Sequence, residues 1–374
     1  MDLMSLVNHA REHNASDIHI SSNHPPMLRV MGDISYLNVP PLTQNDVMQI
    51  LKSSFNDAQM ERYQRDFELD SSIEVGKNLY RVNAYYTNNG PSIALRVIPE
   101  HIMTLGELKI PAIVEQFASM TRGLILVTGP CGSGKSTTLA AIINYINRNF
   151  SRHIITVEDP IEYRFQSEKS LVNQREIDTH TKSFSQALRS ALREDPDIIM
   201  LGELRDLETI QLALTAAETG HLVLSTLHTS SAPKTIDRII DVFPSADKPL
   251  IRTMLASSLE GIISQALIPK VDHKSRVATY EILVATQGIR NLIRENKVHQ
   301  ITSMMEIGSK YGMMLMSQHL KKLEAEGVIN EAIAKELFIE SLDENHKEGG
   351  RLQIDVTPKS KNNVNNTYAD DSQF

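Results

Sequence analysis

The sequence contains only one cysteine, Cys131, among 374 residues. A single thiol cannot form an intramolecular disulfide, and it cannot supply the sulfur ligands of a cysteine-built zinc site. Such low cysteine usage is typical of proteins that work in a reducing compartment. We therefore expect a cytoplasmic protein without a disulfide framework.

Long apolar segments are also missing. No run approaches eighteen uninterrupted apolar residues, and the N-terminus, with Asp2, Arg11 and Glu12, lacks the basic and apolar parts of a secretion signal. We expect a chain that is neither exported nor membrane-spanning, so that any membrane contact is peripheral.

Clustered positive charge is absent as well, because the net charge is −8 and no run of Lys and Arg occurs. Proteins that bind nucleic acid regardless of sequence neutralise its phosphates with clustered Lys and Arg. The composition therefore disfavours a nucleic-acid partner, and with it the helicases.

A phosphate-binding pattern is present. One segment fits the P-loop pattern G-x-x-x-x-G-K-[ST] at every position, and Thr137 follows it: Gly129, Pro130, Cys131, Gly132, Ser133, Gly134, Lys135 and Ser136. The glycines let successive backbone N–H groups converge on a phosphate. Lys135 then reaches the β/γ oxygens, and the Ser136 hydroxyl holds Mg²⁺. An ordinary glycine-rich strand-to-helix turn is the alternative.

The flanking residues favour the P-loop. Residues 124–128 form an apolar run typical of a parallel strand buried on both faces. Leu139, Ile142, Ile143 and Ile146 then recur at the spacing of an amphipathic helix. The segment therefore predicts a site for ATP and Mg²⁺.

Carboxylates follow two more strand-like runs. Residues 153–157 lead into an acidic turn with Glu158 and Glu162, and residues 198–201 lead into Glu203. Ligands of open parallel sheets bind beyond the carboxyl ends of the strands, so these acids should lie near the phosphates. The second run resembles a Walker B element with glycine in place of the usual aspartate. Glu203 is therefore predicted to orient or polarise water, and Glu158 to contribute to the metal shell; a solvated acidic turn is the alternative.

A further strand, at 222–227, has a histidine at each end. Seven residues of extended chain span roughly 23 Å, so His221 and His228 cannot share one small ligand. His228, at the carboxyl end, is better placed to sense a γ-phosphate, whereas His221 more plausibly meets a neighbouring element or subunit. Both could instead be structural histidines.

The first part of the chain predicts a hairpin. Residues 80–86 and 92–98 alternate in polarity, and the Asn-Gly pair between them favours a tight turn. Arg81 and Arg96 project from these strands, and they could be solvated edge charges. A helical pattern at 45–60 precedes the hairpin.

The pattern divides the chain into a first unit (1–98), a linker (99–111), a second unit (112–287), a helical C-terminal region (288–342) and a polar tail (343–374) that we expect to be disordered. A helix over 183–193 carries Arg189 and Arg193 on its outer side, which we interpret as a solvated face.

Several blocks together resemble the type IV pilus retraction ATPases, the PilT family of the secretion-ATPase superfamily. They are GPCGSGKSTTLAA (129–141), ITVEDPIEY (155–163), LVNQREI (171–177), ALRSALREDPDIIMLGELRD (187–206), LTAAETGHLVLSTLHT (214–229) and GIRNLIRE (288–295). The resemblance runs from the N-terminus to about residue 340.

This resemblance implies an α/β protein in which a PAS-like α+β N-terminal domain precedes a RecA-like P-loop NTPase domain with a helical C-terminal region. It implies a cytoplasmic homohexamer, peripheral to the inner membrane, whose Mg²⁺-dependent ATP hydrolysis drives pilus retraction and twitching motility. The implied partners are an inner-membrane pilus platform protein and, as a further option, a second retraction ATPase.

The resemblance also assigns residue roles. Lys135 and Ser136 match the Walker A positions, while Glu162, Glu203, His221 and His228 match the catalytic acids and histidines. Arg81 and Arg96 match basic residues that complete the site of the neighbouring subunit. Which glutamate is the dominant base stays open.

Four alternatives remain. A pilus-extension or type II secretion motor usually has a longer N-terminal region and a four-cysteine zinc insert, and an accessory retraction ATPase fits the nearly complete GIRNLIRE block less well. A nucleotide-gated adaptor would bind ATP without hydrolysing it. The presence of both Glu162 and Glu203 argues against an adaptor. A DNA-translocating motor would need a basic channel.

Overall fold

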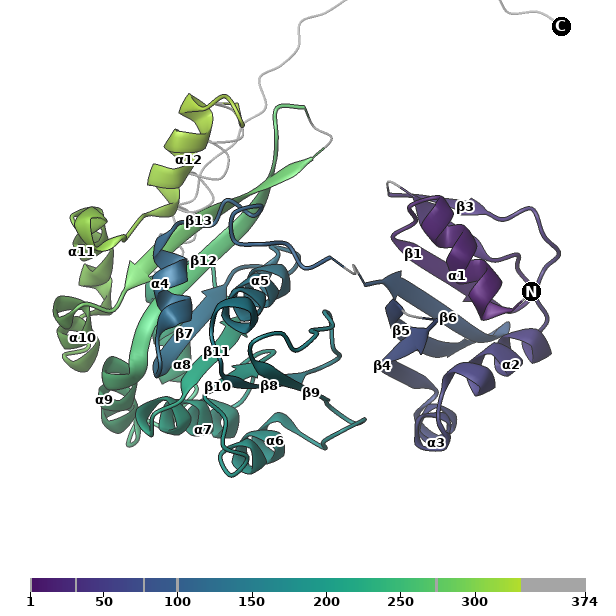
Figure 1. Ribbon diagram of the computed structural model, residues 1–374, viewed down its shortest axis with the longest axis horizontal. Coiled ribbons are helices and arrows are strands. Elements are labelled where there is room, and N and C mark those ends of the chain that lie inside the picture. The colour runs from purple at the N-terminus through teal and green to yellow at the C-terminus, as the bar shows by residue number, and fades with distance from the viewer. Residues whose placement is uncertain (1, 31, 77, 99–100, 273–274, 331–374) are drawn as a thin grey trace, which may run out of the picture.

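The computed structural model describes residues 2–330 except 31, 77, 99–100 and 273–274. Within this part of the chain, two sheets form the centres of two domains, joined by a segment that starts near residue 101 (Figure 1). The last part of the predicted helical region, 331–342, and the predicted tail, 343–374, lie outside the described residues. Every described helix is too short or too polar to span a bilayer.

The first domain is an antiparallel sheet with helices packed on it. The sheet is six-stranded in the order β3-β2-β1-β6-β5-β4. The elements are α1 (Leu3–Glu12), β1 (Asp17–Ser21), β2 (Met27–Val30), β3 (Asp33–Tyr36), α2 (Gln44–Ser54), α3 (Asp57–Asp66), β4 (Glu68–Val75), β5 (Asn78–Thr87) and β6 (Gly90–Val97). Alternating apolar residues of the strands and the inner faces of the helices form one core, which includes Leu6, Ile18, Leu51 and Val82.

The predicted hairpin is confirmed, because β5 and β6 pair with Thr87 opposite Gly90. Arg81 lies directly opposite Arg96 in this register, so both side chains leave the same face of the sheet. The helical pattern predicted over 45–60 is confirmed, but it is divided between α2 and α3. Asn56 and Gln59 form a reciprocal capping box that ends α2 and starts α3.

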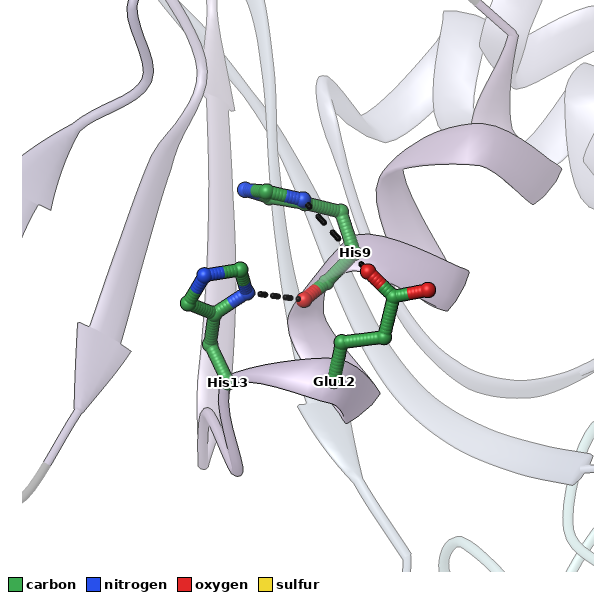
Figure 2. A group of neighbouring side chains, drawn as sticks. All are labelled: His9, Glu12 and His13. Carbon is green, nitrogen blue, oxygen red and sulfur yellow. Dashed lines mark hydrogen bonds and ion pairs between the residues drawn. The ribbon is translucent and has the colours of Figure 1, made fainter.

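Helix α1 ends at a group of polar side chains shown in Figure 2. The Nδ1–H of His13 donates to the carbonyl of His9 at 2.9 Å, and His9 Nδ1 lies 4.0 Å from Glu12 Oε2. The His9 carbonyl also accepts from the His13 backbone N–H at 3.2 Å, so His13 closes the last turn of α1 with both its backbone and its side chain.

The second domain is built on a mainly parallel sheet. Within the described residues it is seven-stranded, in the order β13-β12-β7-β11-β10-β8-β9, and only β13 runs antiparallel to its neighbour. The elements are α4 (Ile113–Ser119), β7 (Gly123–Thr128), α5 (Lys135–Asn149), β8 (His153–Glu158), β9 (Leu171–Glu176), α6 (Phe184–Ala191), β10 (Ile198–Leu201), α7 (Leu207–Glu218), β11 (Leu222–Leu227), α8 (Ala232–Asp241), α9 (Lys248–Ser258), β12 (Leu259–Pro269) and β13 (Arg276–Val284).

The parallel strands bring the predicted site residues to one edge. Strands β7, β8, β10 and β11 are buried apolar runs, as a sheet covered on both faces requires. Because they run parallel, their carboxyl ends meet, and the P-loop, the acidic turn, Glu203 and His228 all follow these ends.

Short helices follow the sheet. They are α10 (Gln287–Arg294), η1 (Val298–Gln300), α11 (Ile301–Glu306), η2 (Ser309–Tyr311) and α12 (Met316–Ala325). Ile289, Ile293 and Met305 are buried in the core of the second domain, so this region packs on the second sheet through its apolar side.

Candidate nucleotide site

A cavity of about 620 Å³ lies at the carboxyl edge of the second sheet and is also lined by the first domain. Most predicted site residues line it: Arg81, Arg96, Cys131, Gly132, Gly134, Lys135, Ser136, Thr137, Glu158, Glu162, Glu203 and His228. The sequence prediction therefore located residues that are far apart in the chain and close together in the fold.

The P-loop adopts a conformation that requires glycine. Gly129, Gly132 and Gly134 have φ values of 148°, 75° and 87°, in the region that L-residues rarely adopt. A Cβ at Gly129 would lie 2.2 Å from the carbonyl oxygen of Gln265 on β12. The side-chain amide of Gln265 also donates to the carbonyl of Ser133 at 2.6 Å, so β12 fixes the loop from behind.

Lys135 is held at the mouth of this loop. Its Nζ donates to the carbonyls of Gly129 and Pro130, both at 2.9 Å, so Pro130 contributes through its backbone. Burial lowers the pKa of Lys135. The buried Ser133 hydroxyl has no hydrogen-bond partner within the described part of the chain. A confined ammonium group, an unpartnered hydroxyl and a curled backbone fit a bound phosphate.

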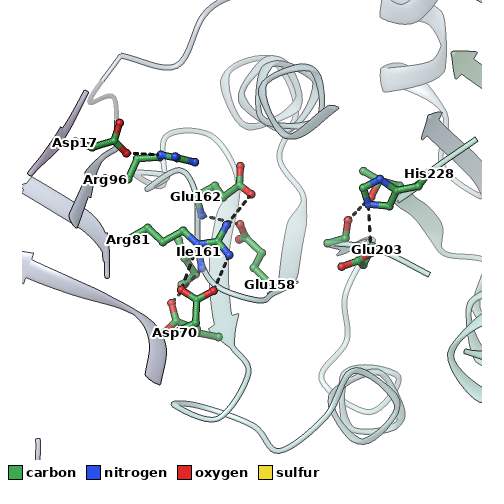
Figure 3. A network of polar contacts seen from close by, with 12 residues as sticks. Asp17, Asp70, Arg81, Arg96, Glu158, Ile161, Glu162, Glu203 and His228 are labelled. Carbon is green, nitrogen blue, oxygen red and sulfur yellow. Dashed lines mark hydrogen bonds and ion pairs between the residues drawn. The ribbon is translucent and has the colours of Figure 1, made fainter. Parts of the chain in front are cut away.

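The acidic turn presents its two glutamates differently (Figure 3). Glu158 is buried and accepts from the Thr156 hydroxyl at 2.6 Å and from the Gln174 amide at 3.0 Å. Burial raises the pKa of Glu158 to about 7. Glu162 is partly exposed, with Oε1 3.9 Å from Arg81 Nη1, and it is the more accessible of the two glutamates.

His228 lies between a carboxylate and the P-loop lysine. Its Nδ1 accepts from Lys135 Nζ at 3.3 Å, and its Nε2 lies 3.5 Å from Glu203 Oε2 (Figure 3). Because an ammonium group can only donate, Nδ1 is the acceptor and Nε2 carries the proton that faces Glu203. The arrangement connects the end of β10 to the P-loop through one imidazole.

Comparison with known proteins agrees with this geometry. Residues 1–352 match the family described as "Type II/IV secretion system protein". The chain belongs to this secretion family. Within it, the chain is 50% identical over 337 residues to the type IV pilus retraction ATPase PilT of Pseudomonas aeruginosa, which covers 90% of this chain and 98% of that protein. It is also 53% identical over 305 residues to a twitching motility protein of Neisseria gonorrhoeae, covering 81% of this chain and 82% of that protein.

A solved structure of the same group is similar throughout. The crystal structure of the pilus retraction motor PilT with bound ADP has a TM-score of 0.84 and 45% identity, covering 90% of this chain and 96% of that one. The predicted fold class is therefore confirmed, and this member of the secretion family is an ATPase of the pilus retraction type.

Arg81 and Arg96 line the cavity of their own chain. A role of either arginine in the site of a neighbouring subunit, which the resemblance implies, stays a prediction. Arg81 pairs with Asp70 at 2.7 Å and Arg96 with Asp17 at 2.9 Å, so each side chain is held in place by its own domain (Figure 3).

His221 lies apart from the other predicted site residues. It precedes β11 at the opposite end from His228, and it does not line the cavity. Its Nδ1–H donates to the carbonyl of Ala216 at 3.0 Å, which closes the turn between α7 and β11. A contact with a neighbouring subunit stays a prediction.

Tyr163 and Arg205 are two of the cavity residues that sequence reasoning missed. Tyr163 lines the cavity and its hydroxyl is 2.8 Å from the Thr137 hydroxyl. Arg205 donates through Nε to Glu203 Oε1 at 2.5 Å and lies 3.5 Å from Asp159. Both residues belong to blocks that carried the resemblance. Arg205 could have been predicted, because it is a cation only two residues after Glu203.

Glu176 connects the two domains. Its carboxylate accepts from the hydroxyls of Ser71 and Ser72 in the first domain, at 3.1 and 2.5 Å. It also accepts from the backbone N–H of Ile161 in the acidic turn at 3.0 Å. The position of the first domain is therefore coupled to the turn that carries Glu162.

Proposed function

We propose that this chain is a motor that hydrolyses ATP in the cavity between its domains and uses the energy to retract a type IV pilus. The observation that carries the proposal is that His228 contacts both the P-loop lysine, Lys135, and Glu203 at the carboxyl edge of the sheet. Phosphoryl transfer needs position and charge more than covalent chemistry, and this cavity supplies both.

Each residue has a role that follows from its position. Backbone N–H groups of the P-loop and the Lys135 ammonium bind the phosphates, so Lys135 must exchange its carbonyl partners for phosphate oxygens. Glu162 and Glu203 orient the attacking water and accept its proton. His228, which contacts both Lys135 and Glu203, senses whether the terminal phosphate is present.

Mg²⁺ fits the site, because a hydroxyl and a buried carboxylate lie at the phosphate end of the cavity. Ser136 and Glu158 are the residues that would hold it. When bound, the ion would neutralise phosphate charge during transfer.

The working assembly that we propose is a homohexamer in the cytoplasm, peripheral to the inner membrane, where it acts on a pilus platform protein. A second retraction ATPase is a further candidate partner. The 50% identity with a pilus retraction ATPase supports this assignment over extension and secretion motors.

A phosphate-release assay tests the catalytic part of the proposal. The wild-type chain should hydrolyse ATP, and Lys135→Ala and Glu203→Ala should each lose most of that activity. An inert wild type that still binds ATP would instead support a nucleotide-gated adaptor. In cells, deletion of the gene should leave excess unretracted surface pili, whereas bald cells would indicate an extension motor.

A further inference from the structure

A second hollow, of about 460 Å³, lies between β9 and α6 and shares no lining residue with the nucleotide cavity. We call it the β9–α6 groove. Two hydroxyl side chains line it together with Arg175, His180, Lys182, Gln186, Arg189 and Arg193. These residues come from the end of β9, the loop after it, α6 and the turn that follows α6.

Every lining side chain can donate a hydrogen bond, and none is acidic or aliphatic. His180 is a donor too, since its Nδ1 accepts from the backbone N–H of Glu176 at 2.9 Å, which leaves the proton on Nε2. Four permanent cations thus converge on one hollow in a chain whose net charge is −8.

Internal ion pairs neutralise only part of this charge. Arg175 pairs with Glu194 at 3.1 Å, and Arg189 pairs with Glu208. Within the described residues, Lys182 and Arg193 have no carboxylate at ion-pair distance. Arg189 and Arg193 are four residues apart, where like charges repel. The interpretation of these arginines as a solvated face leaves this convergence unexplained.

We propose that the β9–α6 groove binds a phosphoryl group. Guanidinium groups match phosphate oxygens in pairs, and a phosphoryl group carries enough charge and acceptor oxygens for several of these donors at once. The volume suits a small polyphosphate. Because no aliphatic side chain lines the groove, it recognises the phosphoryl group and has no surface on which an acyl chain could pack.

Two sources supply this chemistry, a free polyphosphate and a phospholipid headgroup at a membrane surface. Inorganic pyrophosphate probes the first, and vesicles of phosphatidylglycerol compared with phosphatidylcholine probe the second. The P-loop also binds phosphates, so all measurements use the full chain with Lys135→Ala, without magnesium. In that background, each groove variant is compared with the unmodified groove and with the control variant.

The groove variants are Arg193→Gln and, in case that variant does not fold, Lys182→Gln on the exposed loop. The matched control is Arg148→Gln, an exposed arginine of α5 that pairs with Glu168 and lines neither cavity. Each variant removes one positive charge. Circular dichroism establishes that each is folded.

Calorimetry should show about tenfold weaker pyrophosphate binding for each groove variant, equivalent to about 1.4 kcal/mol, with the control nearly unchanged. A loss confined to phosphatidylglycerol vesicles would support the proposal with the lipid as the source. Equal binding of both probes by groove and control variants would overturn it. So would a changed oligomeric mass with unchanged phosphate binding, because the groove would then contact a second copy of the chain.

Discussion

Arg81 lies on the cavity of its own chain, and we predict that a neighbouring subunit cannot replace it. Its guanidinium is fixed by Asp70 at 2.7 Å and lies 3.9 Å from Glu162. Arg81→Ala removes a cation from the cavity and leaves Glu162 without its nearest positive charge. Loss of one preorganised charge partner of a developing anion costs about 10²- to 10³-fold in kcat, and we expect a loss of that order.

Mixing two inactive variants distinguishes a cis from a trans arginine. Lys135→Ala and Arg81→Ala chains are combined in equal amounts, unfolded or dissociated together, reassembled and assayed for phosphate release. If Arg81 acts in cis, every subunit carries one defect within its own site, so the mixture stays as inactive as its components. If Arg81 acts in trans in a closed ring, about a quarter of the sites combine an intact lysine with an intact neighbouring arginine.

Activity in the mixed assembly at about a quarter of the wild-type value would therefore refute our cis assignment. Mixing each variant with wild type serves as the control for subunit exchange. The Asp70→Asn variant should show a smaller kcat loss than Arg81→Ala, because it loosens the arginine without removing its charge.

Three further predictions follow from single residues. Gly129→Ala should weaken nucleotide binding at least tenfold and lower Tm, because the new Cβ would lie 2.2 Å from the Gln265 carbonyl oxygen. Gly132→Ala is the control: its Cβ would have no atom within 4 Å, so it should lower the free energy of unfolding by only about 1 kcal/mol through backbone strain. Equal effects of the two substitutions would contradict the packing argument. Burial raises the pKa of Glu158 to about 7 from an ordinary 4.5, so the folded chain holds this proton more tightly than the unfolded chain. The resulting stability is present below pH 4.5 and is lost as the pH rises through 7, by up to about 3 kcal/mol. The Glu158→Gln variant should show a smaller change of Tm with pH between about pH 5 and pH 8. If Tm changes with pH as steeply as in the wild type, another group causes the pH dependence. Glu176→Gln should weaken the hydrogen bonds to Ser71 and Ser72, at a cost of about 1–3 kcal/mol, and so speed proteolysis of the segment between the domains. Protease resistance equal to that of the wild type would show that the contact between the domains does not depend on this carboxylate.

The nucleotide end of the cavity was predictable because its residues follow strands in a fixed order. Buried parallel strands can be recognised in a sequence as apolar runs, and their carboxyl ends must lie at the same edge of the sheet. Glu162, Glu203 and His228 each follow such a run, so the sequence located them without knowledge of strand order. The hairpin was equally readable from the Asn-Gly turn, which set Arg81 opposite Arg96.

Other features depend on contacts that no local pattern encodes. The helical pattern over 45–60 did not reveal the break between α2 and α3, because the capping box at Asn56 overrides apolar periodicity and its second member, Gln59, is a common helix residue. The position of Arg81 on the cavity of its own chain depends on how the first domain packs on the second. Glu176 helps to fix that packing by its hydrogen bond with the backbone of Ser72, 104 residues earlier in the chain. The β9–α6 groove likewise combines a strand end, a loop and a helix, so single residues there gave only the impression of a solvated face.

A structure with a non-hydrolysable ATP analogue and Mg²⁺ tests the central claim most directly. Our account predicts that Lys135 Nζ leaves the carbonyls of Gly129 and Pro130 for phosphate oxygens, with Glu162, Glu203 and the same chain's Arg81 facing the terminal phosphate. Nucleotide bound elsewhere, or bound here with both glutamates turned away from that phosphate, would contradict it.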